Sequence, residues 1–393
     1  FKYSPFKQLS FKQKEIVDEI EKNITKKYLI EAPAGSGKSV LFTNLAFSLA
    51  EVYPDLRIGL ITTGNLTKQF NLIFKSIGLN NRLIVKTGSQ LIMDAKKNEQ
   101  KYDIIIVDEA HKLKKYYRKG HPNARRHLDE GDDEITLLEK LTDGLVLLYD
   151  PYQGIKPQNI RPAEIRSLTS DYKKVCLMQQ FRIGGDRDFS GEDFLKGILY
   201  GFQLSNDKSF NSKVFKDDYF KIVATFKEVI DYVDDYSHAY PETTNRLIAG
   251  YCREWVSNTG KKENKGKKFE ELPYDWNIDG IQKRWNSTYE DWVKKPNSEK
   301  EIGSIHAIQG YDLNYSGVIV GNDITVKDGK IVAVPENYKD IGGTPLKEGF
   351  NLSELTEYIL NIYYVLLSRG IDGCAVYFED KNVEKLVKER VGL

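Results

Sequence analysis

Short runs of apolar residues alternate with helical patterns along the first part of the chain. Near-continuous apolar runs of about four to eight residues indicate strands that are buried on both faces. The predicted strands lie at residues 28–31, 57–62, 82–86, 102–107 and 144–149, and the predicted helices at 11–22, 38–51, 66–77 and 134–141. Strands that alternate with helices in this way form a parallel sheet covered on both faces. The pattern therefore predicts an α/β domain.

A second series of strands follows the first. Its apolar runs lie at residues 173–178, 245–251, 301–306, 316–320 and 373–378, with a helix over residues 353–367. The chain has 393 residues, which suits two domains of ordinary size. We therefore expect domain 1 to span residues 1–172 and domain 2 residues 173–393, with an insertion at about residues 203–270. Residues 112–133 and 258–268 have the composition of loops.

Charge and hydropathy narrow the class of protein only slightly. The 58 lysines and arginines nearly balance the 57 aspartates and glutamates, so any nucleic acid must bind in a local groove. No apolar run approaches the roughly 20 residues that span a bilayer, and the N-terminus lacks the pattern of a signal peptide. We therefore expect a cytoplasmic protein without a membrane partner. The chain starts at Phe1 instead of methionine, which suggests a piece of a longer protein.

A glycine-rich turn connects the first predicted strand to the next predicted helix. Its sequence, APAGSGKS at residues 32–39, differs from the P-loop pattern GxxxxGK[ST] only at the first position, where Ala32 replaces glycine. Backbone N–H groups of such a turn bind phosphates, the lysine reaches the β- and γ-phosphates, and the final hydroxyl binds Mg²⁺. The alternative is a Gly/Ser-rich turn that arose by chance. The predicted ATP-binding residues of this turn are Ala34, Gly35, Ser36, Gly37, Lys38 and Ser39.

The strand predicted over residues 102–107 delivers two acids at its carboxyl end, in the sequence DEAH. Ligands of open α/β sheets bind outside the carboxyl ends of strands, so these acids should lie next to the P-loop. Asp108 is the predicted second ligand of Mg²⁺, together with Ser39, and Glu109 the predicted general base for the attacking water. A solvated acidic turn is the alternative interpretation. The two motifs together predict ATP as substrate and Mg²⁺ as cofactor.

The remaining motifs resemble those of superfamily 1 helicases and occur in that family's order. Besides the P-loop and DEAH, these are YDPYQ at residues 149–153, QFR at 180–182, SIHAIQGYD at 304–312 and VLLSRG at 365–370. Tyr149 stands where the family usually has glycine, and Asp312 where it usually has glutamate. Gln13 lies where such enzymes carry a glutamine that reads adenine.

A narrower resemblance is to the Schlafen group 3-like DNA/RNA helicase domain. It is carried by residues 285–286, 309–310, 314–319 and 361–365, and the motifs together cover nearly the whole chain. The resemblance implies two RecA-like P-loop NTPase domains with parallel sheets and insertions in the second. It also implies single-stranded DNA or RNA as partner, and a fused or separate nuclease or effector module.

The resemblance further implies which residues outside the P-loop and DEAH act on the γ-phosphate. Phosphoryl transfer spreads negative charge over the γ-phosphate oxygens, and Arg182 and Arg369 are the candidates to meet that charge. Gln153 and Gln309, the latter followed by Gly310, are candidate sensors of the γ-phosphate. The alternative for either arginine is a surface ion pair or a positive charge at a helix C-terminus, and the alternative for either glutamine is a hydrogen-bonded polar turn.

Candidate nucleic-acid contacts follow the strands of domain 1 and continue into domain 2. They are Thr62, Thr63, Asn65, Thr87 and His306, with the basic segment at residues 112–126 as a further candidate. Hydroxyls and N–H groups bind phosphates without sequence preference. The alternatives are a packed histidine and a solvated basic loop.

Three functions remain open from the sequence. The first is an ATP-dependent helicase or single-strand translocase that hydrolyses ATP in a cleft between two RecA-like domains. The second is an ATP-driven conformational switch that binds a protein partner and unwinds little or nothing. The third, a kinase-like phosphotransferase, does not account for the motifs in domain 2.

Overall fold

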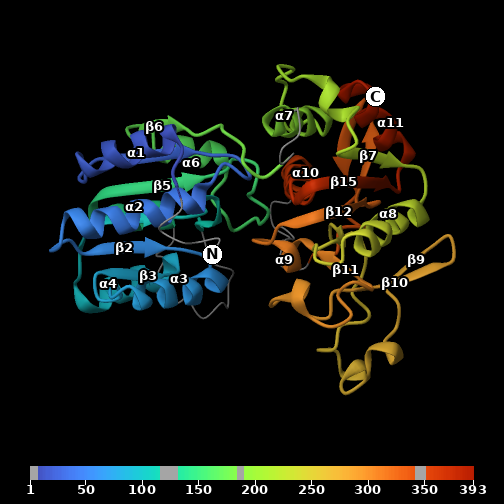
Figure 1. The fold of residues 1–393 in the computed structure, drawn as a ribbon, viewed down its shortest axis with the longest axis horizontal. Helices are drawn as coiled ribbons and strands as arrows, with labels where there is room; N and C mark the ends of the chain where they lie inside the picture. Colours follow the sequence, from blue (N-terminus) through green and yellow to red (C-terminus); the bar gives the residue numbers. More distant parts are fainter. Residues whose placement is uncertain (1–7, 116–131, 184–189, 341–350) are drawn as a thin grey trace. The chain divides into compact units, whose positions relative to one another are not determined.

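The chain forms two α/β units, Phe1–Gln179 and Gln180–Leu393. They are seen in a computed structural model that describes residues 8–115, 132–183, 190–340 and 351–393 (Figure 1). The predicted fold class, α/β with parallel sheets, is therefore confirmed. Each unit has its own central sheet, and each is described by itself below.

The first unit contains a six-stranded parallel sheet with the strand order β3-β2-β4-β5-β1-β6. The strands are β1 (Lys27–Glu31), β2 (Ile58–Ile61), β3 (Leu83–Lys86), β4 (Tyr102–Val107), β5 (Thr142–Tyr149) and β6 (Lys173–Cys176). All carboxyl ends meet at one edge because every pairing is parallel. The loops that carry the predicted motifs start at this edge.

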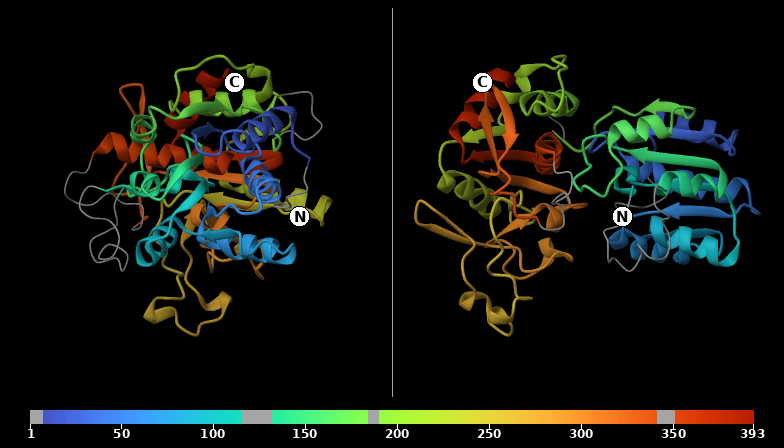
Figure 2. Two further views of the ribbon diagram at one scale, coloured as in Figure 1. Left: turned by 90° about the vertical axis from the view of Figure 1, so that its left-hand side faces the viewer. Right: turned by 180° about the vertical axis from the view of Figure 1, so that it is seen from behind.

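Helices cover both faces of this sheet, as the two further views of Figure 2 show. One face packs against α1 (Phe11–Glu21), α2 (Lys38–Val52) and α3 (Gly64–Ser76), and the other against α4 (Gly88–Asn98), α5 (Glu134–Glu139) and α6 (Pro162–Leu168). Successive strand residues point to opposite faces, so Ile30 belongs to the first core and Leu29 to the second. A short 3-10 helix, Ala110–Lys112, follows β4.

The second unit contains a seven-stranded sheet with the order β7-β15-β12-β8-β11-β10-β9, parallel except for the β9–β10 hairpin. Its strands are β7 (Phe220–Val223), β8 (Arg246–Ala249), β9 (Trp276–Ile278), β10 (Ile281–Trp285), β11 (Glu301–Ser304), β12 (Leu313–Val320) and β15 (Gly370–Phe378). A separate antiparallel hairpin is made by β13 (Ile324–Lys327) and β14 (Lys330–Ala333).

Helices also lie on both faces of the second sheet. These are α7 (Gly191–Gly201), α8 (Phe226–Ala239), α9 (Ile305–Ile308), α10 (Leu352–Leu367) and α11 (Lys381–Val391), with 3-10 helices at Ser212–Phe215, Lys262–Asn264, Phe269–Glu271 and Trp292–Lys294. Phe226 of α8 contacts Tyr377 of β15, and Phe202 at the end of α7 stacks on Phe378 of the same strand. Tyr377 and Phe378 are successive strand residues, so α8 and α7 cover opposite faces of the sheet. No helix in the described ranges has the length and apolar character needed to cross a membrane.

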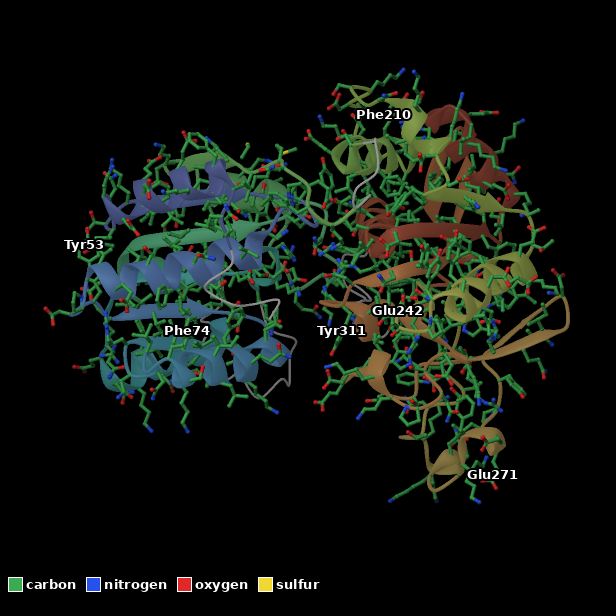
Figure 3. The ribbon with its side chains drawn as sticks, in the orientation of Figure 1. Tyr53, Phe74, Phe210, Glu242, Glu271 and Tyr311 are labelled. Atoms are coloured by element: carbon green, nitrogen blue, oxygen red, sulfur yellow. The ribbon has the colours of Figure 1, made fainter. Side chains whose placement is uncertain are left out.

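Two predicted boundaries are wrong. The strand expected to open domain 2 is β6, and it pairs with β1 of the first unit in the register Tyr28↔Lys173, so the first unit continues to Gln179. The expected insertion at about residues 203–270 contains β7, α8 and β8, which belong to the second unit and its sheet. The true excursion from that sheet lies between β8 and β9, and Glu271, labelled in Figure 3, lies near its tip.

A buried carboxyl group in the second unit predicts a pH-dependent stability. Asp323, in the turn after β12, is fully buried and accepts a hydrogen bond of 2.5 Å from the Tyr363 hydroxyl. Its Oδ2 atom has no hydrogen-bond partner among the described residues. Burial raises the pKa of Asp323 from an ordinary 3.8 to about 7. The native state therefore holds this proton more tightly than the unfolded chain.

The free energy of unfolding should consequently fall as pH rises from about 4 to about 7. Asp323→Asn keeps the acceptor for Tyr363 but cannot ionise, so we expect it to unfold at a higher temperature than wild type at about pH 8, with a smaller difference at about pH 5. Thermal unfolding by circular dichroism measures this. Asp18→Asn, at an exposed position on α1, is the control. Equal pH dependence in wild type and Asp323→Asn would contradict the assignment.

Candidate active site

The P-loop connects β1 to α2 and has the backbone geometry of a phosphate-binding turn. Gly35 and Gly37 have φ angles of 77° and 81°, in the left-handed region that favours glycine. Gly37 is the N-cap of α2, so the first N–H groups of the helix point into the turn. Lys38 is only 7% exposed, and its Nζ donates to the carbonyls of Ala32 at 2.8 Å and Pro33 at 3.1 Å. The lysine charge therefore lies over the turn.

Two oxygen ligands suitable for Mg²⁺ meet beside this turn. The Ser39 hydroxyl donates to Asp108 Oδ2 at 3.1 Å, although 69 residues separate them in sequence. A hydroxyl and a carboxylate are hard oxygen donors, and Mg²⁺ in phosphate sites typically takes one or two protein oxygens and fills the rest with water and phosphate. Burial raises the pKa of Asp108 to about 7, and the adjacent Glu109 carboxylate adds to this rise. A divalent cation would remove this cost of ionisation.

Glu109 adopts a left-handed backbone conformation, with φ of 57° and ψ of 47°. Its carboxylate oxygen Oε2 lies 2.9 Å from His111 Nε2. Burial alone would raise the pKa of Glu109, but His111 and Lys112 hold it well below its usual range. The side chain is therefore a carboxylate at neutral pH, as a proton acceptor must be.

A chain of contacts links Glu109 to the predicted sensor Gln153. The backbone N–H of Asp150 donates to His111 Nδ1 at 3.3 Å, and Gln153 Nε2 donates to Asp150 Oδ2 at 2.8 Å. Burial lowers the pKa of His111, and Glu109 opposes that change. Neither His111 nor Asp150 was given a role from the sequence. Both residues follow parallel strands, β4 and β5, and this position at the carboxyl ends of the strands could have identified them as site residues.

Gln13 lies against the P-loop, as its predicted role requires. Its Nε2 donates to the carbonyls of Ser36 at 3.4 Å and Gly37 at 3.3 Å. Its Oε1 accepts from the backbone N–H of Ser10 at 2.9 Å, which completes a capping box at the start of α1. These contacts place the amide at the site and also give it a structural role. The reading of adenine stays a prediction.

The second unit brings its two predicted arginines together. Arg182 Nε lies 2.8 Å from Asp312 Oδ1, and its Nη1 donates to the Ser368 carbonyl at 3.2 Å. Arg369 is 4% exposed and donates to the carbonyls of Val365 at 3.0 Å and Tyr311 at 3.3 Å. The segments at residues 180–182, 304–312 and 365–370 therefore form one cluster, although they are far apart in sequence.

Two buried polar atoms of the predicted motifs are free to form a hydrogen bond with a ligand. Among the described residues, neither Ser36 Oγ in the first unit nor Gln309 Nε2 in the second has a hydrogen-bond partner. Buried polar groups normally have partners, so an unpaired donor in a motif indicates a group that a ligand can satisfy. Gly310 follows with a φ of 94°, and a Cβ added to it would meet no atom within 4 Å, so the turn there is open.

The predicted nucleic-acid contacts of the first unit share the carboxyl edge of its sheet. Thr62 and Thr63 follow β2, and Thr87 follows β3. The Thr87 hydroxyl accepts from the N–H of Gln90 and caps α4, so a structural role already accounts for it. The side chain of Asn65 and residues 116–126 of the basic segment lie outside the described part of the chain. Contacts to nucleic acid stay a prediction for all of these residues.

His306 in the second unit is held by a carboxylate that the sequence did not reveal. Its Nε2 lies 2.8 Å from Oδ2 of Asp340, a residue that is 6% exposed. The ring also lies near those of Tyr251 and Tyr289. His306 is therefore partly the packed histidine of the alternative interpretation, yet it lies beside exposed aromatic surface.

The chain is similar to known proteins in three comparisons. The family model described as Schlafen group 3, DNA/RNA helicase domain, matches residues 25–380. The uncharacterized protein YPL245W of Saccharomyces cerevisiae is 25% identical in an alignment 400 residues long, gaps included, that covers 92% of this chain and 84% of that protein. The crystal structure of Pif1 helicase from Candida albicans is similar over 95% of each chain, with 16% identity and a TM-score of 0.40.

Proposed function

The chain belongs to the Schlafen group 3 DNA/RNA helicase domain family, and from this premise we propose that it is an ATP-dependent helicase or single-strand translocase. The contact between Ser39 and Asp108 is the observation that carries the proposal, because it joins a P-loop hydroxyl to the acid of the DEAH sequence. In P-loop NTPases these two motifs bind the same metal-bound triphosphate, so a contact between them is expected of an ATP site.

The first unit would bind and hydrolyse ATP. The N–H groups of Ala34 to Gly37 and the ammonium of Lys38 would bind the β- and γ-phosphates. Ser39 and Asp108 would hold Mg²⁺, which supplies positive charge that neutralises the phosphate oxygens. Glu109 would accept a proton from the attacking water, while His111 fixes the position of its carboxylate.

The second unit would supply the positive charge for the transition state. Arg182 and Arg369 are the two candidates, and their contacts with Asp312 and Tyr311 tie them to the turn that carries Gln309. Positive charge placed against a transferring phosphoryl group stabilises the charge that develops there. Hydrolysis in a cleft between the two units would then depend on their closure around ATP, and the closure would move the bound strand.

The partner in this proposal is single-stranded DNA or RNA. The support is the description of the family and the row of polar residues at the carboxyl edge of the first sheet. A second candidate function is an ATP-driven switch that binds a protein and unwinds little or nothing. The near balance of 58 basic and 57 acidic residues favours this alternative, since it provides no overall attraction for phosphates.

Stimulation of ATP hydrolysis by single strands separates the two functions. We expect the steady-state ATPase rate to rise several-fold on addition of single-stranded DNA or RNA at low salt, where electrostatic binding is strongest. Release of phosphate measures the rate, and blunt duplex of the same length is the comparison. Hydrolysis that no single strand stimulates would contradict the motor and favour the switch.

A further inference from the structure

All four tryptophans of the chain lie between residues 255 and 292, in the excursion of the second unit and its return to β11. Trp276, Trp285 and Trp292 are at most 1% exposed and form part of the core. Trp255 is only partly buried, and its ring meets that of Tyr289 edge-on, at 5.2 Å between centroids and an angle of 78°. Tyr289 is 42% exposed. This ring pair is therefore one of the aromatic surfaces that packing leaves partly open, alongside Tyr274, which is 45% exposed.

Two neighbours, Tyr251 and His306, fix the position of the Tyr289 ring. Its hydroxyl lies 2.8 Å from that of Tyr251, which is 5% exposed. The His306 ring lies 6.2 Å from Tyr289 and 5.6 Å from Tyr251, and Asp340 holds that imidazole. A side chain that is fixed in this way loses little conformational freedom when a flat ligand stacks on it. Tyr289 is therefore already prepared for stacking.

The same segment is tied to the motif at residues 304–312. Asp291, two residues after Tyr289, accepts a hydrogen bond from the Tyr311 hydroxyl. Figure 3 shows Tyr311 beside α9 and the start of β12, and its carbonyl accepts a hydrogen bond from Arg369. His306 and Tyr311 thus hold the segment 289–291 at two points. Residues 304–312 therefore contact both the segment that carries Tyr289 and the cluster of Arg182 and Arg369.

We propose that Tyr289 and Trp255 form a stacking site for one unpaired base of single-stranded nucleic acid. Every base has a π-face, so aromatic stacking gives affinity without sequence preference. Lys294 and Lys295 follow within the same segment, but Glu290 and Asp291 lie next to Tyr289, and Lys294 Nζ is 3.6 Å from Asp291 Oδ1. Phosphates would therefore meet little net positive charge. Stacking is therefore the main contribution here. The site rests on the proposed function and adds a contact outside the helicase motifs.

Binding of a labelled oligonucleotide tests the site. Tyr289→Ala should weaken binding of fluorescein-labelled single-stranded DNA or RNA by roughly 5- to 150-fold, the range for loss of one stacked base. Tyr289→Phe keeps the ring and should bind nearly as tightly as wild type, while Trp255→Ala should lose affinity as Tyr289→Ala does. Fluorescence anisotropy measures the affinities, and thermal unfolding shows whether each variant is folded.

Tyr240→Ala is the matched control. Tyr240 is 46% exposed, but its ring already stacks on those of Tyr236 and Tyr315, so its loss should leave binding unchanged. An oligomer of the same length with abasic sites throughout provides a second test. Wild type and Tyr289→Ala should bind it equally, since it has no base to stack.

The outcomes separate this site from the function on which it rests. If wild type binds no single strand, the helicase or translocase function fails and the stacking site fails with it. If wild type binds but Tyr289→Ala binds as well, the stacking site alone is wrong, and the exposed rings would suit a protein partner instead. If Tyr289→Ala also binds the abasic oligomer more weakly than wild type does, stacking is wrong, because the ring would then contact the sugar-phosphate backbone of the nucleic acid.

Discussion

Lys38→Ala is expected to reduce ATP turnover by at least roughly a hundredfold, the loss that follows removal of one preorganised charge from a transition state. The lysine is buried over the P-loop and is held by the carbonyls of Ala32 and Pro33. Alanine leaves those carbonyls without the ammonium and removes the positive charge from the β- and γ-phosphates. Release of phosphate at saturating ATP measures the effect.

The control for this variant is Lys12→Ala. Lys12 is an exposed residue of α1 that forms an ion pair with Glu15, and its loss should leave turnover unchanged. Circular dichroism and the unfolding temperature show whether Lys38→Ala keeps its fold. A folded Lys38→Ala protein with turnover near that of wild type would remove Lys38 from the catalytic residues.

Glu109→Gln is expected to lower turnover by roughly a hundred- to ten-thousandfold while ATP still binds, because an amide cannot accept a proton from water. Glutamine has nearly the same shape, so the left-handed turn and the approach to His111 are retained. Phosphate binding depends on the P-loop and not on this carboxylate. Binding of a fluorescent ATP analogue and single-turnover hydrolysis measure the two effects separately.

Glu15→Gln provides the comparison for this second variant, since Glu15 is an exposed glutamate of α1. It should hydrolyse ATP as wild type does. Two results would argue against Glu109 as general base: hydrolysis by Glu109→Gln at the rate of wild type, or loss of ATP binding in a folded protein. The second result would indicate that Glu109 acts on binding of the nucleotide.

The local parts of this structure could be predicted from the sequence, because their signals lie within a few residues. The apolar run before the P-loop, its glycines and the helix after it occur as expected, with Gly35 and Gly37 in the left-handed conformation. Parallel pairing then follows from the alternation of strands and helices. That pairing brings Asp108 to Ser39, as predicted from the carboxyl edge of a sheet.

Pairings between distant segments could not be predicted in the same way. The residues of β6 form a strand pattern, but that pattern does not specify a partner, and two lysines in it mark only an edge strand. The ion pair of Arg182 with Asp312 and the hydrogen bond between His306 and Asp340 join side chains that have no local signal in common. Their discovery required the tertiary structure.

The position of β6 decides where the two halves can be separated for study. Leu177, just after the strand, donates its backbone N–H to the carbonyl of Glu31, the residue before the P-loop. A polypeptide ended at residue 172 would lack this strand and leave the N–H and C=O groups along one side of β1 open to other chains, which invites aggregation. One that continues to Gln179 retains the full sheet. A polypeptide made of the first unit alone should therefore end at Gln179.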